Sequence, residues 1–363
     1  MSKIPIDIVE LCILPRLPVK SLLRFKSVSK SWRTLISSND FILLHNRQRD
    51  LSSDENRVHI FPGESCTLHL HYLDAPLAPV SLCPYPWPQP ILSSRFSDEI
   101  TIRASCEYFL LVSRWYSHSS GLVLLNPFTR IYYEIPDNTL SGYPKYGLYL
   151  DEDHDDLKVV RVAGWKITIF SLKTNLWTLI TTKPMMYRGY HMEDYYLCVN
   201  KNLLYTILHH YNDYWNIRII CFDIQAKQWT KDVPLPSNNP YVFDLCVFDG
   251  LLCALGCDKE AATGTLSAWV MKDYSWVKLM TVVSNNTGDR DYRPIAYRKG
   301  SRHEILCRRI WRSELFWYNL RDKEISKVDF KGYPEDGSSY NGYHLDHICK
   351  ESLMNFRGVR PQS

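Results

Sequence analysis

A hydrophobic two-strand unit recurs along the chain and limits the folds that it can adopt. Each copy has an apolar strand, a polar turn and a second strand that opens on a bulky side chain. A second hairpin precedes the unit at 195–208, 243–256 and 294–308. Four strands at a period of about 45–50 residues predict a propeller blade. The opening residues, separated by 45, 52, 47 and 49 positions, are Tyr132, Trp177, Trp229, Trp276 and Ile325.

This repeat predicts a mainly β, propeller-like domain of about six blades over residues 58–335. A single blade cannot bury both faces, whereas stacked blades bury them together, and aromatic rings add area worth about 25 cal/mol per Å2. Five units are visible, and a sixth is expected from 58–92, where 74–92 is a proline-rich irregular loop. The C-terminal segment 336–363 is expected to close a blade and then to be disordered. A β-sandwich with Greek-key strands is the alternative.

Residues 1–46 are predicted to form a small helical module, followed by a polar linker at 47–57. Pro5 suits the first turn of a helix, and Pro15 and Pro18 end that helix. Three helices of this size cannot bury enough apolar surface to offset their ordering entropy, so they need the rest of the chain or another protein. The second helix begins near Val19, and the third carries Val28, Trp32, Leu35 and Ile36 at helical spacing.

The helical module contains a long and specific run of sequence. It has RLPVKSLLRFK at 16–26 and VSKSW at 28–32, after Ile4-Pro5 and DIV at 7–9. These residues resemble the F-box of plant F-box proteins. The chain is one residue longer than the family pattern between Pro5 and Arg16, so the phase of the first helix stays open, and with it which of Val9, Leu11 and Ile13 face a partner. The alternative is that the helices only cap the main domain.

Three short motifs in the β region follow the F-box in the order of the same plant family. They are LNPFTR at 125–130, CFDI at 221–224 with Trp229, and DGLLC at 249–253. The region resembles the F-box-associated domain. The diglycine of a kelch repeat is missing, so kelch is not the right label. The resemblance implies a three-helix F-box followed by the propeller-like domain.

The resemblance implies a substrate-recognition subunit of a Skp-cullin-F-box ubiquitin ligase, with no catalytic group of its own. The F-box would dock a Skp-type adaptor, which joins a cullin and a RING subunit. The β domain would bind an unknown protein substrate for ubiquitination. One subgroup of the family is the pollen-side S-locus receptors, which recognise ribonucleases. Nothing in this sequence distinguishes that subgroup from the large generic group of plant F-box proteins. The residues expected at the adaptor face are Pro5, Ile8, Leu17, Pro18, Leu22, Leu23, Val28 and Trp32, some of which could instead hold the core of the module.

Loops between the predicted strands are the expected site of substrate recognition. The loops 183–194 and 209–216, among others, are rich in Tyr, Trp, Arg and Asp, which anchor protein interfaces. For any single residue, ordinary loop packing is the alternative. The candidate substrate-binding residues are Tyr187, Arg188, Tyr190, Tyr211, Tyr214 and Trp215.

The net charge of +4 is concentrated in the helical module. Residues 1–50 hold 9 Lys/Arg and 4 Asp/Glu, a net of +5, which leaves a net of −1 for the remainder. A nearly neutral β domain argues against nucleic acid as its ligand. Solvated helix faces are the alternative for the basic residues. Those that could face an acidic partner are Lys20, Arg24, Lys26, Lys30 and Arg33.

The eleven scattered cysteines indicate reduced thiols in an intracellular protein and not a disulfide framework. No signal peptide is expected, because charges interrupt the first residues, and no apolar run reaches the ~18 residues of a membrane span. We therefore expect a cytoplasmic or nuclear protein without a membrane partner.

The chain has no P-loop, dinucleotide-binding, nucleophile-elbow or HExxH motif, and we expect no cofactor. The acidic run 151–156 lacks the Gly and the distal Glu of an EF-hand, so a solvated hairpin tip is favoured over calcium binding. Zinc is disfavoured because no CxxC pair exists. Two other functions stay open: a propeller enzyme with a helical cap, and a non-degradative F-box scaffold.

Overall fold

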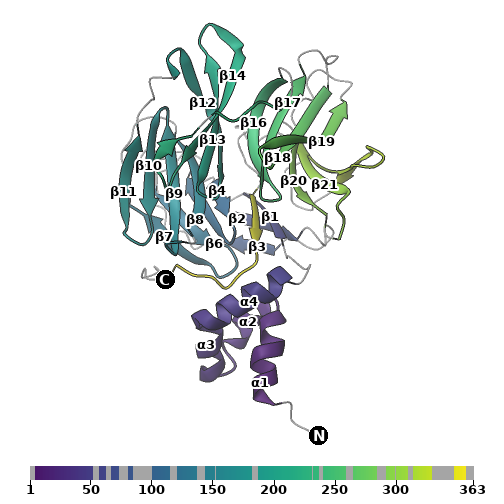
Figure 1. Ribbon diagram of the computed structural model, residues 1–363. Helices are drawn as coiled ribbons and strands as arrows, with labels where there is room; N and C mark the ends of the chain where they lie inside the picture. The colour runs from purple at the N-terminus through teal and green to yellow at the C-terminus, as the bar shows by residue number, and fades with distance from the viewer. Residues whose placement is uncertain are drawn as a thin grey trace, which may run out of the picture. The chain divides into compact units, whose positions relative to one another are not determined.

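The computed structural model of the protein shows N-terminal helices followed by six four-stranded antiparallel sheets (Figure 1). The chain forms two compact units, Met1–Ile135 with His347–Ser363, and Pro136–Asp346. The structure describes residues 5–51, 57–62, 67–72, 81–84, 100–114, 121–136, 144–151, 153–181, 187–230, 232–236, 240–258, 265–283, 292–298, 300–309, 314–328 and 347–356.

The first unit begins with a helical module that has one helix more than predicted. A fourth helix follows Ser38, whose hydroxyl accepts a hydrogen bond from the Phe41 amide at 3.3 Å. It extends through residues 47–51, where a linker is predicted. Phe41, Ile42 and His45 give it a buried face with helical spacing. The helices are α1 (Ile6–Ile8), α2 (Val19–Phe25), α3 (Lys30–Ser37) and α4 (Asn39–Leu51).

A π-helical turn, η1 (Val9–Ile13), continues α1 and leads into the 3-10 turn η2 (Leu14–Arg16). The Leu14 amide donates to the Val9 carbonyl, five residues earlier. Each π turn takes up one residue more than an α turn, so η1 accounts for the extra residue between Pro5 and Arg16. The phase that the sequence left open is thereby fixed. Val9 packs against the core of the module, whereas Leu11 and Ile13 are exposed.

The core of the helical module is small and mostly aliphatic, with Phe41 as its buried aromatic residue. The Ser29 hydroxyl caps α3 by accepting from the Trp32 amide at 3.1 Å, and the Trp32 ring packs edge-on against Phe25 with centroids 5.4 Å apart. One further member of the core, Leu353, comes from the far end of the chain. The buried residues contributed by the helices are Leu14, Val19, Leu22, Ile36, Phe41 and Ile42.

Two sheets complete the first unit, and one of them joins both ends of the chain. The first has the order β24-β1-β2-β3, and β24 pairs antiparallel with β1. Its strand β3 lies inside the predicted irregular loop 74–92. The strands are β1 (Arg57–Pro62), β2 (Thr67–Tyr72), β3 (Ser81–Pro84), β24 (His347–Lys350), and, in the second sheet, β4 (Ile100–Cys106), β5 (Phe109–Arg114), β6 (Leu122–Asn126) and β7 (Ile131–Ile135).

The second unit holds four sheets, each an antiparallel meander of consecutive strands. They are β8 (Lys145–Asp151), β9 (Asp156–Ala163), β10 (Lys166–Ser171) and β11 (Leu176–Thr181); β12 (Tyr190–Asn200), β13 (Leu203–His210), β14 (Asp213–Asp223) and β15 (Gln228–Trp229); β16 (Pro240–Phe248), β17 (Leu251–Asp258), β18 (Thr265–Lys272) and β19 (Ser275–Val283); β20 (Tyr292–Tyr297), β21 (Glu304–Arg309), β22 (Glu314–Asn319) and β23 (Ile325–Val328).

The predicted repeat corresponds to equivalent positions in five sheets. Each opening residue lies on the last strand of its sheet, opposite an apolar partner of the preceding strand, as Trp177 lies opposite Phe170 and Trp229 opposite Phe222. Two of the indoles make the same hydrogen bond. Trp177 Nε1 donates to the Pro136 carbonyl at 2.8 Å, and Trp276 Nε1 donates to the Pro234 carbonyl at 2.6 Å. Within the second unit the first strands of successive sheets contact one another. The predicted propeller-like fold is confirmed.

A glycine sets the spacing between two of these first strands. Gly147 of β8 faces Val199 of β12, and a Cβ at Gly147 would overlap the Val199 Cγ2 methyl. We expect Gly147→Ala to lower the free energy of unfolding by about 1–3 kcal/mol, because a β-branched side chain cannot turn away in a packed interface. Chemical denaturation of the full chain measures this change. Val199→Ala in the Gly147→Ala background should restore part of the loss. An unchanged denaturation midpoint for the single variant would contradict the packing.

Candidate partner-binding surfaces

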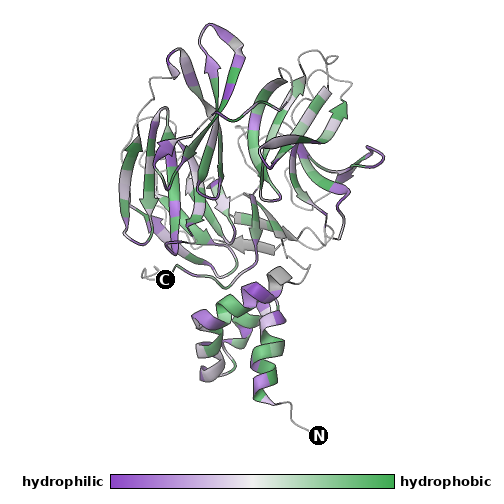
Figure 2. Cartoon of the chain, viewed as in Figure 1, coloured by the Kyte–Doolittle hydropathy of each residue, from purple (hydrophilic) through white to green (hydrophobic). Residues whose placement is uncertain are grey.

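The N-terminal helical segment 6–13 exposes apolar side chains that its own module leaves uncovered. Leu11 is 61% exposed, and Ile6, Ile8 and Ile13 are exposed as well. Much of the segment is coloured as hydrophobic in Figure 2, although Asp7 and Glu10 interrupt its apolar residues. A helix that is apolar on most of its surface is normally buried. We call residues 6–13 the apolar helix, and its composition is that of a surface that another protein covers.

The residues predicted at the adaptor face fall into three groups in the structure. Leu22 is 0% exposed and belongs to the core of the module, so its assignment to the adaptor face is wrong. Leu17, Leu23 and Trp32 are half-buried against that core. The sequence analysis left out Ile6, and it left open whether Leu11 faces a partner, which the π-helical turn decides. The four predicted residues that are exposed are Pro5, Ile8, Pro18 and Val28.

Of the five basic residues predicted to face an acidic partner, four are exposed. Lys26 is half-buried, and this burial lowers the pKa of its amine. Exposed charges on such a surface favour a partner of opposite sign and speed its association. The four exposed residues of this set are Lys20, Arg24, Lys30 and Arg33.

A second candidate surface lies in the second unit, at the ends of β12, β13 and β14. Tyr211, in the turn after β13, is 64% exposed, and Trp215 of β14 is 53% exposed. The Tyr211 ring stacks on His191 with centroids 5.2 Å apart, and Trp215 meets Tyr241 of the next sheet edge-on at 4.8 Å. His209, which is buried, lies 5.9 Å from the His191 ring and 6.3 Å from the Tyr241 ring.

These five rings form a continuous series of contacts across two sheets, with His209 buried beneath the others, and we call them the aromatic ladder. Its backbone is fixed locally, because the Tyr211 amide donates to the Gly189 carbonyl at 2.9 Å and the Asp213 carboxylate accepts from the Trp215 amide at 3.1 Å. Rigid, partly exposed aromatic side chains are typical of the residues that dominate binding energy at protein interfaces. The members are His191, His209, Tyr211, Trp215 and Tyr241.

Two of the predicted substrate-binding residues are structural. Tyr187 is buried, and its hydroxyl donates to Asp232 at 2.7 Å; burial raises the pKa of this phenol. Tyr190 is also buried, and its hydroxyl donates to Asn216 at 3.0 Å. Their assignment to a substrate surface is therefore wrong. Arg188 is exposed, and the side chain of Tyr214 lies outside the described residues.

The predicted loop 209–216 is largely the ends of two long strands, β13 and β14, which carry Tyr211 and Trp215 at their turn (Figure 1). His209, on β13, is buried. The sequence analysis missed His191 and Tyr241 as candidate binding residues. They lie on β12 and β16, and only folding brings them into contact with Tyr211 and Trp215.

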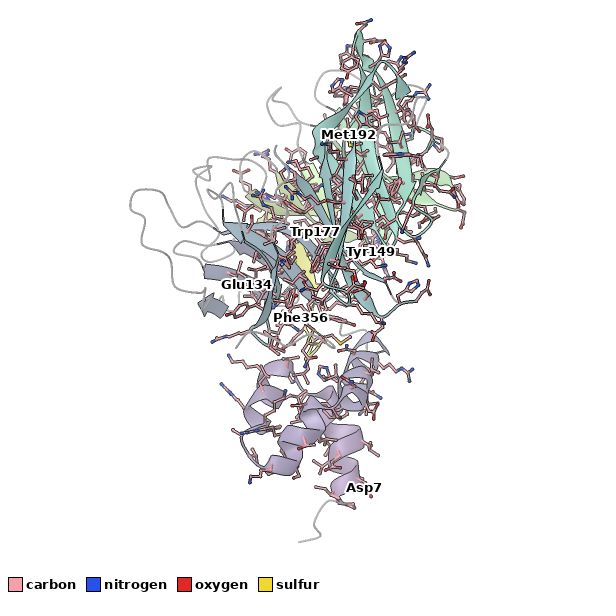
Figure 3. The ribbon with its side chains drawn as sticks, turned by 90° about the vertical axis from the view of Figure 1, so that its left-hand side faces the viewer. Asp7, Glu134, Tyr149, Trp177, Met192 and Phe356 are labelled. Carbon is pink, nitrogen blue, oxygen red and sulfur yellow. The ribbon has the colours of Figure 1, made fainter. Side chains whose placement is uncertain are left out.

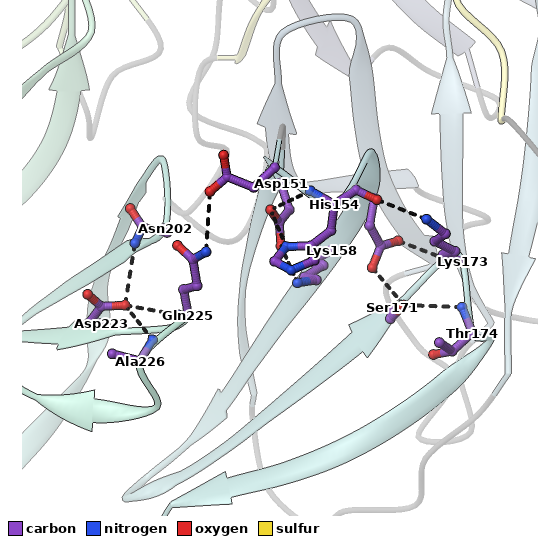
Figure 4. Close-up of polar contacts among 12 residues, drawn as sticks. Asp151, His154, Lys158, Ser171, Lys173, Thr174, Asn202, Asp223, Gln225 and Ala226 are labelled. Atoms are coloured by element: carbon purple, nitrogen blue, oxygen red, sulfur yellow. Dashed lines mark hydrogen bonds and ion pairs between the residues drawn. The ribbon is translucent and has the colours of Figure 1, made fainter.

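The acidic run at 151–156 holds a hairpin together (Figure 4). Asp151 and Asp156 are buried, so the prediction of a solvated tip is wrong for these two residues. The Asp151 carboxylate accepts from the Lys158 amine and from the His154 imidazole at 3.0 Å. Burial raises the pKa of Asp151, but these hydrogen bonds outweigh it and the pKa lies below its usual value. Asp156 accepts from the Ser171 hydroxyl at 2.7 Å and from the Lys173 amide at 2.9 Å.

No group of three or more His, Cys, Asp or Glu side chains that could hold a metal ion occurs among the described residues. The cysteines in this part of the chain are free, and most are buried. Burial raises the pKa of the Cys307 and Cys349 thiols. In the described ranges no helix has the length and apolar character needed to cross a membrane.

Comparison with known proteins matches both parts of the chain. Residues 1–44 match the F-box domain, and residues 88–340 match the F-box associated beta propeller domain. "F-box protein CPR1" of Arabidopsis thaliana is 26% identical over 100% of this chain and 93% of its own length. "F-box protein At4g22390" of the same plant is 24% identical over 90% of this chain and 86% of its own length.

Among solved structures, a chain of a nidogen/laminin complex is similar with a TM-score of 0.42 and 11% identity, over 81% of this chain and 98% of that chain. Helices α1 to α3 and five of the six sheets, from β4 to β23, lie within the regions that the two family models match. The sheet β24-β1-β2-β3 lies outside them. The chain belongs to the plant F-box proteins that carry an F-box associated beta propeller domain.

Proposed function

We propose that this protein is the substrate-recognition subunit of a Skp-cullin-F-box ubiquitin ligase, acting in the cytoplasm or nucleus. The observation that carries the proposal is the apolar helix, because an F-box module that leaves this helix uncovered requires a protein partner. In an F-box the partner is a Skp-type adaptor. The exposed Val28 and the basic residues of the module extend the surface available to it.

The mechanism is proximity. The adaptor would link the chain to a cullin and a RING subunit, which recruits the charged conjugating enzyme, while the β domain binds the substrate. Holding both on one scaffold raises the effective concentration of substrate lysines near the conjugating enzyme. The chain itself then supplies binding energy and orientation, and the ubiquitin transfer is carried out by the conjugating enzyme.

The direct test is complex formation between the purified full-length chain and a purified plant Skp-type adaptor. We expect an equimolar mixture to elute from a size-exclusion column as one 1:1 complex. Separate elution at micromolar concentrations would overturn the proposal. Adaptor binding without ubiquitination of any captured protein in a reconstituted ligase would instead assign the chain to the scaffold class.

We propose the aromatic ladder as the substrate-binding surface. Replacing Tyr211 and Trp215 together by alanine should remove the two most exposed rings of the ladder. Truncating an interface hot spot costs about 2–4 kcal/mol, so the loss of even one of these two contacts should lower substrate affinity about 30-fold or more. Adaptor binding should be unchanged, because the ladder and the F-box are separate parts of the chain.

Affinity capture from plant extract with quantitative mass spectrometry measures this effect. The matched control replaces Leu176 and Leu179 by alanine, since both are comparably exposed apolar residues on β11 of the same unit. Proteins lost with the Tyr211/Trp215 variant and kept with the control are candidate substrates. An identical set of captured proteins for all three chains would exclude the ladder as the substrate surface.

A further inference from the structure

The chain passes from β24 into a short segment, residues 351–356, that lies between the helical module and the sheets of the first unit (Figure 1). Where the sequence analysis expects disorder, these residues are largely buried. We call residues 351–356 the C-terminal strap. Its buried members are Glu351, Ser352, Leu353 and Phe356.

One side of the strap completes the helical module. The Glu351 carboxylate accepts a buried hydrogen bond from the Val19 amide at 3.1 Å, at the start of α2. Pro18 stands at the N-cap of α2 and provides no side-chain cap. Glu351, 332 positions after Val19, therefore supplies the acceptor that a Ser or Asp at the N-cap normally would. The Ser352 hydroxyl donates to Asn46 of α4 at 2.8 Å.

Leu353 lies in the hydrophobic core of the helical module. It packs with Leu14, Val19 and Leu22, three residues that come from the segment preceding α2 and from α2 itself. A module of about 45 residues has little apolar surface to bury, so one fully buried leucine is a large share of its stability. The F-box core is therefore made from both ends of the chain.

The other side of the strap is attached to the second sheet. Asn126, at the end of β6, donates from Nδ2 to the carbonyls of Ser352 at 3.1 Å and Met354 at 2.7 Å. The Phe356 ring stacks on Phe109 of β5 with centroids 5.1 Å apart (Figure 3 labels Phe356). Because Asn126 also accepts from the Phe128 amide at 2.9 Å, it fixes its own turn while it holds the strap.

We infer that the C-terminal strap is a positioning element of the adaptor-binding module, so that adaptor docking depends on residues 351–356 through the helices that they hold in place. This inference rests on the proposed function. It implies that the F-box becomes fully competent only after the last strand, β24, has paired with β1. A chain that ends before the strap would lack the contacts that stabilise the helical module, and we expect it to bind the adaptor more weakly.

The test uses the full-length chain and three variants of the strap. Leu353→Asp places a charge in the module core. Glu351→Ala removes the cap of α2, whereas Glu351→Gln keeps an oxygen that can accept from the Val19 amide. The control is Lys350→Ala, which removes an ion pair with Glu107 at 3.2 Å next to the strap and leaves the module untouched.

Hydrogen–deuterium exchange gives the first readout and needs no adaptor. We expect the amides of α2 and of α4 to exchange at least about tenfold faster in Leu353→Asp, while β13 and β17 keep their protection. Calorimetric titration with a plant Skp-type adaptor gives the second. Adaptor affinity should fall about tenfold in Leu353→Asp and about fivefold in Glu351→Ala, and stay near the original value in Glu351→Gln and Lys350→Ala.

Unchanged exchange in α2 together with unchanged adaptor affinity in Leu353→Asp would overturn the inference. Equal losses in Glu351→Gln and Glu351→Ala would remove the capping role of Glu351. If the unaltered chain fails to bind the adaptor, the proposed function falls, and the exchange result still decides whether the strap positions the helical module.

Discussion

Replacing Ile8 and Leu11 by aspartate is expected to abolish adaptor binding, with a loss of at least about 100-fold in affinity. Both side chains are exposed on the apolar helix, so in the unbound chain the two carboxylates stay in water. In a complex they would be buried without a partner, which costs several kcal/mol. Since neither side chain is part of the module core, the free energy of unfolding should change by less than about 1 kcal/mol.

Calorimetric titration of the adaptor into each chain measures the affinity, and chemical denaturation measures the stability. The contrasting control is Leu22→Ala, which creates a cavity in the module core and should destabilise the module by about 2–5 kcal/mol. Adaptor binding that survives the Ile8/Leu11 change would show that the apolar helix is covered by something else.

The second large effect is expected at an ion pair that joins two sheets of the second unit. Arg293 of β20 donates from Nη2 to the Asp244 carboxylate of β16 at 3.1 Å, and to the Leu245 carbonyl at 3.0 Å. The side chains are 13% and 10% exposed. Replacing Arg293 by methionine leaves a carboxylate without its buried counter-charge. We expect the second unit to lose about 3–5 kcal/mol of stability near pH 7.

This loss should depend on pH in a defined direction. Burial already raises the pKa of Asp244 above its usual value, although Arg293 opposes the rise. Without Arg293 the pKa rises further. A carboxyl group whose folded pKa exceeds its unfolded pKa stabilises the fold below the unfolded pKa, and this stabilisation is lost as the pH rises through the folded pKa. The deficit of Arg293→Met should therefore be larger at pH 7 than at pH 5.

Denaturation of the full chain at both pH values checks this prediction, with Asp244→Asn in the Arg293→Met background as the control. The double variant should recover much of the lost stability and lose the pH dependence. The thiols of Cys198 and Cys246 lie near this ion pair. Because both thiols are present in every variant, the comparison tests only the removal of Arg293 and Asp244. A deficit that is the same at both pH values would contradict the buried-charge explanation.

The sequence was sufficient for features that repeat or that are local. The spacing of Trp177, Trp229 and Trp276 predicted equivalent positions in successive sheets, because each blade solves the same packing problem. The F-box motif predicted the first three helices. The fourth helix was missed, although Phe41, Ile42 and His45 carry a helical pattern, because the polar residues after them favoured a linker.

Features that depend on long-range contacts could not be predicted. Nothing near Glu351 in sequence indicates that it caps α2, since its partner is 332 positions away. Tyr187 and Tyr190 are residue types typical of a binding loop. In the folded chain, however, the Tyr187 hydroxyl donates to Asp232 and the Tyr190 hydroxyl donates to Asn216, and both side chains are buried. The F-box motif contains both core residues and exposed residues. Only the packing of the helices shows that Leu22 is in the core and that Val28 is exposed.

The measurement that tests the central claim most directly is recovery of the tagged full-length chain from plant tissue in which the proteasome is blocked. Quantitative mass spectrometry of the isolated material compares the unaltered chain with the Ile8/Leu11 double variant. The account predicts that a Skp-type adaptor and a cullin co-purify with the unaltered chain and are lost together with the double variant. Recovery of the unaltered chain without an adaptor or a cullin would contradict the assignment to a ubiquitin ligase.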